Sequence, residues 1–150
     1  MRERPLPRIV ISATALSLVP LLGGLVLIIL PDLVPLDPIV AERAIIGYSA
    51  LLLAFLGGVR WGIRIASGAG TDMTYVFGAL NALVGLITLF LPFSPAIAIL
   101  TVGFAGQGAW DAWSGFRKTV PEPYARRRIA ATMAACLVLI AILLAHAAMR

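Results

Sequence analysis

The chain has 150 residues, of which 61% are hydrophobic and only 13% are charged, and its mean hydropathy is +0.99. Soluble domains are about 45–50% apolar and about 25% charged, so the composition excludes an ordinary soluble domain and indicates a membrane protein. The net charge of +5 does not indicate nucleic-acid binding, because the basic residues lie at the ends of apolar segments, as in membrane helices. The single cysteine, Cys136, excludes an intrachain disulfide and a cysteine metal cluster.

Five segments have enough apolar residues to cross a membrane, which takes roughly 20 of them. We therefore expect an all-α bundle, a single transmembrane domain over residues 1–150, with spanning helices at about 9–30, 39–66, 73–91, 96–116 and 129–149. Pro20 should kink the first helix. Thr71 or Asp72 should cap the third helix and Ser94 the fourth. The polar segment 117–128 is expected to lie at the membrane surface.

The positive charges are distributed unevenly over the expected loops. If the N-terminus is inside, only Arg43 and Arg150 lie outside, and ten basic residues lie inside: Arg2, Arg4, Arg8, Arg60, Arg64, Arg117, Lys118, Arg126, Arg127 and Arg128. Because loops on the cytoplasmic side are enriched in Lys and Arg, we expect a cytoplasmic N-terminus and a C-terminus outside. The loops are too short to hold a soluble catalytic domain.

Charged residues occur inside two of the expected helices. Arg60 lies about one turn deeper than Arg64 in the second helix, and Asp111 lies at a similar depth in the fourth, one turn from Gln107. A charge among apolar residues is costly unless it is paired or reaches water. Two interpretations remain: a cytoplasmic-leaflet site that holds an anionic headgroup or relays a proton, or a structural Arg–Asp pair that fixes the register of two helices, with Gln107 satisfying the remaining donors.

Small residues indicate close contacts between helices. The sequence Gly58-x-x-x-Gly62 matches the motif by which membrane helices approach each other closely. The glycines expected to serve helix packing are Gly57, Gly58, Gly62, Gly103 and Gly106. The alternative is a ligand that lies against exposed backbone at these positions.

Aromatic and polar residues add two further candidates. Trp61 and Trp110 lie on the expected cytoplasmic side, where they form either the ordinary interfacial belt or an aromatic pocket beside the buried charges. Asn81, within the third helix, is expected to make an interhelical hydrogen bond. His146 is the only histidine, and the sequence offers it no second metal ligand nearby. With no Ser–His–Asp or Cys–His pattern and no phosphate-binding glycine loop, we expect no catalytic residue, no metal and no cofactor.

The octet from Phe55 to Gly62, FLGGVRWG, resembles the signature of a family of small multi-spanning proteins of unknown function. That family occurs in proteobacteria and has a mitochondrial transmembrane relative in animals. The stretch 106–113 and the segment 123–128 are also similar to it. The resemblance implies a multi-pass protein of the bacterial inner membrane and brings no established activity. Tryptophan-rich sensory proteins also have five helices, but their Trp-x-Pro-Pro motif is absent from this sequence.

Two functions are compatible with these features. The first is a non-enzymatic accessory or assembly factor that binds a larger membrane complex, a membrane-protein partner or a second copy of the chain. It follows from the small-residue helix faces, the short loops and the lack of a catalytic set. The second is a binder or carrier of a lipid or small amphipathic ligand. Its site, which suits an anionic lipid, would comprise Arg60, Trp61, Arg64, Gln107, Trp110 and Asp111.

Overall fold

The computed structural model describes residues 15–68, 72–117 and 122–149 of the chain. The elements within these ranges are α2 (Val19–Ile29), the 3-10 helix η1 (Pro31–Leu33), α3 (Pro38–Ser67), α4 (Met73–Thr88), α5 (Phe93–Phe116) and α6 (Glu122–Ala148). The described residues contain no strand. The expected all-α fold is therefore confirmed for this part of the chain.

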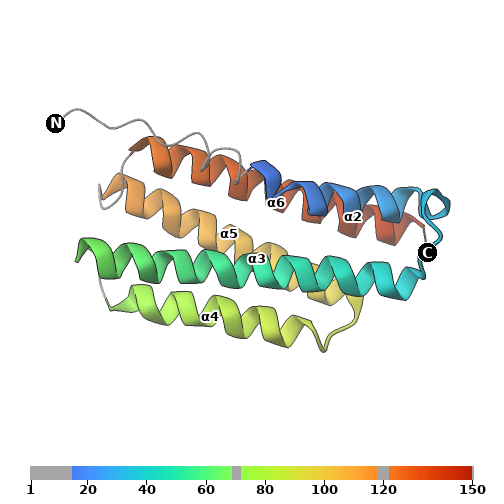
Figure 1. The fold of residues 1–150 in the computed structure, drawn as a ribbon, viewed down its shortest axis with the longest axis horizontal. Helices are drawn as coiled ribbons and strands as arrows, with labels where there is room; N and C mark the ends of the chain where they lie inside the picture. The colour runs from blue at the N-terminus through green and yellow to red at the C-terminus, as the bar shows by residue number, and fades with distance from the viewer. Residues whose placement is uncertain (1–14, 69–71, 118–121, 150) are drawn as a thin grey trace.

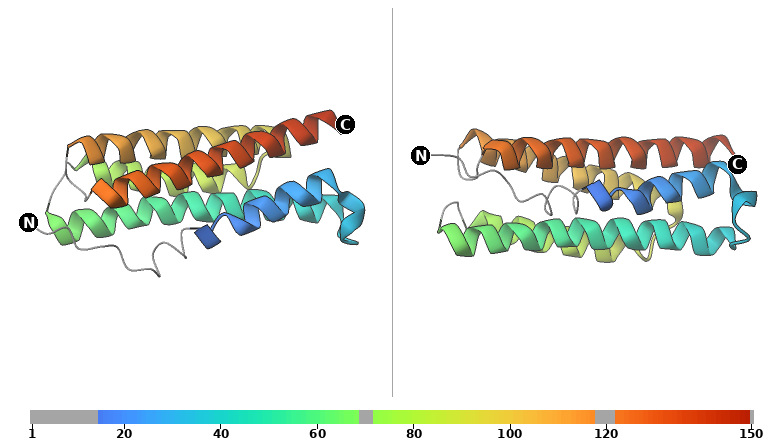
Figure 2. Two further views of the ribbon diagram at one scale, coloured as in Figure 1. Left: turned by 90° about the horizontal axis from the view of Figure 1, so that it is seen from above. Right: turned by 45° about the horizontal axis from the view of Figure 1, so that its top comes forward.

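Consecutive helices run antiparallel in one elongated bundle (Figure 1). Helices α3 and α4 pack together as one hairpin and α5 and α6 as another, while α2 lies against α3 and α6. Figure 2 shows that α2 covers only the part of the bundle nearest η1 and the C-terminus. The opposite end is formed by the C-terminal ends of α3 and α5 and the N-terminal ends of α4 and α6 (Figure 1).

The interior of the bundle is apolar, and so is much of its outside. Leu53, Leu100 and Leu139 are completely buried, together with other core residues of α2, α3, α5 and α6. Large apolar side chains also point outward, including Leu51 and Phe116, which are 72% and 85% exposed. Soluble monomers rarely expose apolar surface on this scale, so the outer surface requires lipid or a protein partner to cover it.

Two of the described helices are long and apolar enough to cross a membrane, judged by length and composition alone. They are α3 (Pro38–Ser67) and the Tyr124–Ala148 part of α6. Helices α2 and α4 are apolar but shorter, with 11 and 16 residues. The structure therefore supports two of the five spans that were expected from the sequence. The first expected span includes residues 9–14, which lie outside the described ranges.

Several helix ends differ from the sequence expectation. Helix α6 begins at Glu122, so part of the segment expected to lie on the membrane surface is helix. Helix α5 begins at Phe93 after Pro92, and Ser94 does not cap it, because its hydroxyl hydrogen-bonds a histidine instead. Asp72 precedes α4 without a capping hydrogen bond from its side chain. A one- or two-residue shift at a helix end has little meaning, but the earlier start of α6 adds almost two turns.

Proline and aspartate define the beginnings of the first two elements. Helix α2 begins at Val19 with Pro20 in its first turn, where the missing N–H costs no helical hydrogen bond. A turn at residues 17–18 precedes it, so Pro20 lies in the first turn of α2 and not inside a longer helix, where it was expected to cause a kink. Helix α3 is capped by Asp37, whose Oδ1 accepts a hydrogen bond from the backbone N–H of Ile39 at 2.7 Å. Caps of this kind satisfy one of the free N–H groups at a helix start.

Helix α4 ends at Thr88, before the expected end at residue 91, and an arginine of the neighbouring helix contacts the turn that follows. The Nη1 of Arg43 donates hydrogen bonds to the carbonyl oxygens of Leu89 at 3.0 Å and Leu91 at 3.2 Å. The last carbonyls of a helix have no partner within it, and here the backbone N–H groups of the following turn satisfy those of Leu86, Ile87 and Thr88. Arg43 satisfies two carbonyls just beyond the helix and so ties this turn to α3.

The glycines fall into two groups according to the space around them. A Cβ at Gly57 would collide with the carbonyl oxygen of Gly78, and one at Gly103 would lie 2.7 Å from a methyl carbon of Leu53. These glycines permit α3 to pack closely on α4 and α5. A Cβ at Gly58, Gly62 or Gly106 would have no neighbour within 4 Å. Of the five glycines expected to serve helix packing, Gly57 and Gly103 are thus used inside the chain, and the other three face outward.

The adjacent pair Gly57 and Gly58 tests this assignment. Gly57→Ala should lower the free energy of unfolding by about 1–3 kcal/mol, the usual cost of overpacking, because backbone atoms of α4 occupy the space for the methyl group. Gly58→Ala should leave stability unchanged or raise it by up to about 1 kcal/mol, the helix-propensity difference between the two residues. Chemical unfolding of the purified protein gives both values. Equal effects of the two substitutions would contradict the close α3–α4 contact.

Candidate functional site

A buried carboxylate joins three helices near one end of the bundle. Asp111 of α5 accepts a hydrogen bond at Oδ1 from Nη2 of Arg60 in α3, at 2.8 Å, and one at Oδ2 from Nε of Arg128 in α6, at 2.9 Å. The side chains of Arg60, Asp111 and Arg128 are only 6%, 10% and 11% exposed. We call these three residues, with Gln107 and Asn81, the Asp111 network. Arg60 and Asp111 thus form a direct ion pair, which their similar depth in the sequence had left open.

The remaining helix of this region is joined through an amide pair. Asn81 of α4 donates from Nδ2 to Oε1 of Gln107 in α5, at 2.7 Å, which confirms the interhelical hydrogen bond expected for Asn81. Gln107 does satisfy a donor of Arg60, but with its backbone carbonyl, which accepts from Nη2 at 2.9 Å. The guanidinium carbon of Arg60 lies 5.4 Å from the ring centroid of Trp110, within the range of a cation–π contact.

Arg128 completes the connection between α6 and α3. Its Nη2 donates to the carbonyl oxygen of Leu56 at 3.3 Å, and its Nη1 donates to the hydroxyl of Tyr124 at 3.1 Å. Tyr124 lies one turn before Arg128 on α6, so the two share a face of the helix. Arginine suits this position because its planar group presents several donors in fixed directions and can bridge a carboxylate, a hydroxyl and a carbonyl together.

The Asp111 network contains more positive than negative charge. Its two guanidinium groups share one carboxylate, and the described residues provide neither arginine with a second one. Arg60 Nε and Gln107 Nε2 are also buried without a hydrogen-bond partner among the described residues. Buried donors are nearly always satisfied by protein or ordered water. The network is therefore chemically suited to an additional acceptor with negative charge.

Two residues expected in the same site lie elsewhere. Trp61 of α3 is 41% exposed, donates from Nε1 to the carbonyl oxygen of Tyr75 at 2.9 Å and packs edge-on against the Tyr75 ring. Arg64 donates to the carbonyl oxygen of Gly68 and lies 3.8 Å from the exposed carboxylate of Asp72. Both side chains thus secure the α3–α4 connection. Of the expected set, Arg60, Gln107 and Asp111 belong to the network, and Trp110 borders it through its contact with Arg60.

A second polar cluster at the opposite end of the bundle was not expected from the sequence. His146 of α6 makes a 2.9 Å hydrogen bond from Nε2 to Oε1 of Glu42 in α3, and its Nδ1 lies 3.2 Å from the hydroxyl of Ser94 in α5. The ring of Phe93 packs against the imidazole, with centroids 4.5 Å apart. We call Glu42, Ser94 and His146 the His146 cluster. Ser94 and Glu42 lie 52 and 104 positions before His146 in the sequence, so no local sequence motif predicts the cluster.

The His146 cluster has the composition of a catalytic triad, but its arrangement serves packing. In hydrolase triads the serine lies at the substrate and the carboxylate behind the imidazole, whereas here Phe93 covers the imidazole and Ser94 sits in the first turn of α5. The described residues hold no group of three or more His, Cys, Asp or Glu side chains that could bind a metal ion. The cluster joins α3, α5 and α6 by hydrogen bonds, as the Asp111 network does at the other end.

The fold and these clusters define an α-helical bundle with an apolar exterior, internal polar contacts at both ends and two helices long and apolar enough to cross a membrane. Residues 6–144 match the model of the family described as proteins of unknown function, DUF3429. The match covers most of the chain, which therefore belongs to this family. No curated protein and no solved structure shows significant similarity to the chain.

Substitution of the shared carboxylate tests the importance of the Asp111 network. Asp111→Asn should lower the free energy of unfolding by about 3–5 kcal/mol, because two buried guanidinium groups lose their counter-charge. Asp72→Asn is the matched control: this carboxylate is 96% exposed and 3.8 Å from Arg64, and exposed pairs contribute little. Chemical unfolding of both variants gives the comparison. A loss for Asp111→Asn no greater than for Asp72→Asn would refute a stabilising role for the network.

Proposed function

We propose that the protein is a multi-pass protein of the bacterial inner membrane, with five helices crossing the bilayer, the N-terminus in the cytoplasm and the C-terminus outside. The length and apolar character of α3 and α6 support this proposal, as do the large apolar side chains that point outward from every described helix. The basic residues of the described ranges are concentrated at the end where α3 and α5 finish and α6 begins. The positive-inside rule assigns that end to the cytoplasm.

Within the membrane, the protein acts by binding: it is a non-enzymatic accessory or assembly factor that docks against a larger membrane complex. The observation that carries this proposal is an unused small-residue face on α3. Gly58 and Gly62 lie on the exterior with open space at their Cβ positions, although the contacts of α3 with α4 and α5 already use other glycines. Leu51, Phe55 and Ile65 follow the same face at helical spacing and are 72%, 64% and 71% exposed.

A face of this kind permits another helix to approach closely. In lipid, helices associate through van der Waals packing rather than through the hydrophobic effect, and small residues allow the backbones to come together. The flanking large side chains then pack beside the partner helix. The open glycines are therefore better suited to a protein partner than to lipid chains, which gain nothing specific from a flat surface.

Leucine substitutions on this face test the docking proposal. Gly58→Leu and Gly62→Leu should each reduce the amount of co-purifying membrane protein about tenfold, equivalent to about 1.4 kcal/mol, because the new side chain holds the helices apart. Gly23→Leu is the control, since Gly23 is an exposed glycine of α2 that also has nothing within 4 Å of its Cβ position. Native mass spectrometry after gentle extraction from the membrane measures the association. If all three variants retained the same partners as the wild type, the docking face would be abandoned.

A second candidate function is binding of an anionic lipid or amphiphile at the cytoplasmic-leaflet end, favoured by the excess positive charge of the Asp111 network. The phosphate or carboxylate of such a ligand would accept hydrogen bonds from the unpartnered donors Arg60 Nε and Gln107 Nε2. Hydrogen bonds between ionised groups are stronger than neutral ones. The aromatic ring of Trp110, which packs against Phe77 at 4.6 Å between centroids, would border the ligand.

A charge-balanced substitution separates this candidate from a purely structural network. Arg60→Gln leaves Asp111 paired with Arg128, so the network becomes neutral while its carboxylate remains satisfied. We expect this variant to fold and to lose a retained anionic lipid in native mass spectrometry. Arg117→Gln removes an exposed charge at the same end, where the guanidinium stacks on Trp113 at 4.7 Å, and should keep the lipid. Equal lipid retention in both variants and the wild type would eliminate the anion site.

A further inference from the structure

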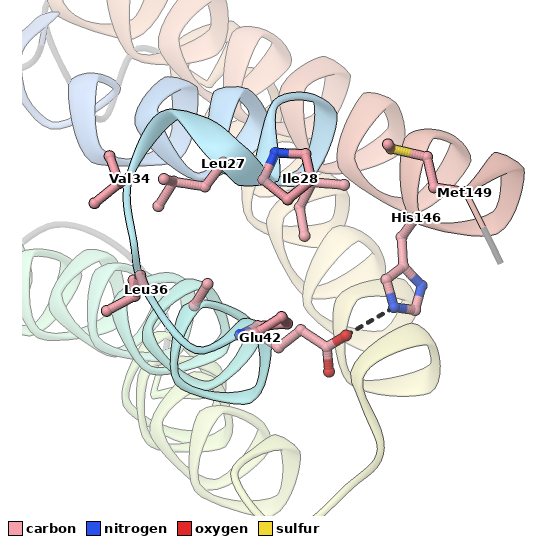
Figure 3. Close-up of a pocket in the computed structure, with 10 residues that line it drawn as sticks. Leu27, Ile28, Val34, Leu36, Glu42, His146 and Met149 are labelled. Atoms are coloured by element: carbon pink, nitrogen blue, oxygen red, sulfur yellow. Dashed lines mark hydrogen bonds and ion pairs between the residues drawn. The ribbon is translucent and has the colours of Figure 1, made fainter.

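A cavity opens at the end of the bundle opposite the Asp111 network, between α2, η1, α3 and α6 (Figure 3). Its volume is about 250 Å³. The apolar part of the wall includes Leu27 and Ile28 from α2 and Val34 and Leu36 from the loop after η1. An apolar cavity of about 150 Å³ is large enough to bind benzene, so this one is large enough for a small organic ligand.

One wall of the cavity is polar, and its orientation is fixed by the His146 cluster. Glu42 and His146 both line the cavity, and Figure 3 shows the Glu42 carboxylate and the His146 imidazole meeting at its edge. The imidazole is held on its other side by Ser94 and by the ring of Phe93. His146 has a side chain only 7% exposed, whereas Glu42 is 24% exposed. The carboxylate is therefore the charged group that a ligand in the cavity can reach.

The charges around the cavity have the opposite sign to those of the Asp111 network. Among the described residues at this end, Asp32, Asp37 and Glu42 carry carboxylates, and Arg43 is the basic residue. Arg43 directs Nη1 to the carbonyl oxygens that follow α4, away from the cavity. No Lys or Arg of the described ranges lines the cavity. The local potential therefore favours a cation and disfavours an anion.

We propose that this cavity binds a small amphiphile with a primary ammonium head and a short single alkyl chain. The alkyl chain occupies the space between Leu27, Ile28, Val34 and Leu36, and the ammonium group donates a hydrogen bond to the Glu42 carboxylate. A carboxylate has about four acceptor positions, so Glu42 can accept this bond while it keeps its existing partners, the His146 imidazole among them. This site is independent of the proposed docking face and of the anion site, which lie on other parts of the molecule.

The ligand class is tested with three probes of equal chain length. Hexylammonium, hexanol and hexanoate are titrated into the full-length protein in a non-ionic detergent, and binding is followed by isothermal titration calorimetry. We expect saturable binding of hexylammonium at one site, about tenfold weaker binding of hexanol, and none of hexanoate, since charge-assisted hydrogen bonds are about twice as strong as neutral ones. Equal affinities for hexylammonium and hexanol, or the absence of saturable binding, would overturn the proposal.

Two neighbouring loop residues provide a matched pair for locating the site. Val34 lines the cavity, whereas Leu33 does not. Val34 is 43% exposed and Leu33 is 61% exposed, so a larger side chain at either position should leave the fold intact. Val34→Trp should fill the cavity and weaken hexylammonium binding at least about tenfold, equivalent to about 1.4 kcal/mol, whereas Leu33→Trp should leave it unchanged. Identical binding by the two variants would show that the amine partitions elsewhere and would refute the site.

The role of the carboxylate is tested by Glu42→Gln, which keeps the size of the side chain. We expect this variant to bind hexylammonium no better than hexanol, because the charge has gone while the apolar walls remain. Ser94→Ala is the control, because it also removes a hydrogen bond to His146 but keeps the Glu42 carboxylate. The thermal unfolding midpoints of both variants show how far each substitution destabilises the protein. If Glu42→Gln retained the full preference for the amine, the assignment of Glu42 as the ammonium partner would be wrong.

Discussion

The arrangement of α3, α5 and α6 depends on a single carboxylate, because Asp111 is the common acceptor for guanidinium groups from two other helices. Charges taken out of water are stable only while they remain paired. A shift of α3 or α6 by one turn along α5, about 5.4 Å, would break one of the two pairs and leave a buried arginine without its counter-charge. The interaction thus specifies the relative depth of these three helices at this end of the bundle.

The two ends of the bundle have the same construction with opposite electrostatics. At one end an aspartate is surrounded by arginines, with spare donors from Arg60 and Gln107. At the other, a histidine is held between Glu42 and Ser94 beside an apolar cavity. Both clusters tie α3, α5 and α6 together. Between them the interior is mainly apolar, and buried hydroxyls such as those of Ser49 and Thr88 bond carbonyls of their own helices.

The helical fold and all of the Asp111 network except Arg128 could be predicted from local patterns: the length of apolar segments, and the depth of a polar or charged residue within its segment. Arg128 was missed because two prolines made its segment look irregular, although Pro123 falls in the first turn of α6, where proline is tolerated. The His146 cluster was missed for a different reason. It joins residues from three helices at the same end of the bundle, and only the packing of those helices brings them into contact.

The early end of α4 has a consequence for the membrane arrangement proposed above. With 16 residues, α4 is about 24 Å long at about 1.5 Å per residue, whereas the hydrocarbon core of a bilayer is about 30 Å thick. In the proposed arrangement, a bilayer that contacts this side of the bundle would have to become thinner next to α4, at a modest cost per ångström of mismatch. The side formed by α3 and α4 would then gather shorter-chain lipids or other proteins with equally short helices, giving the bundle a lipid preference without a lipid-binding pocket.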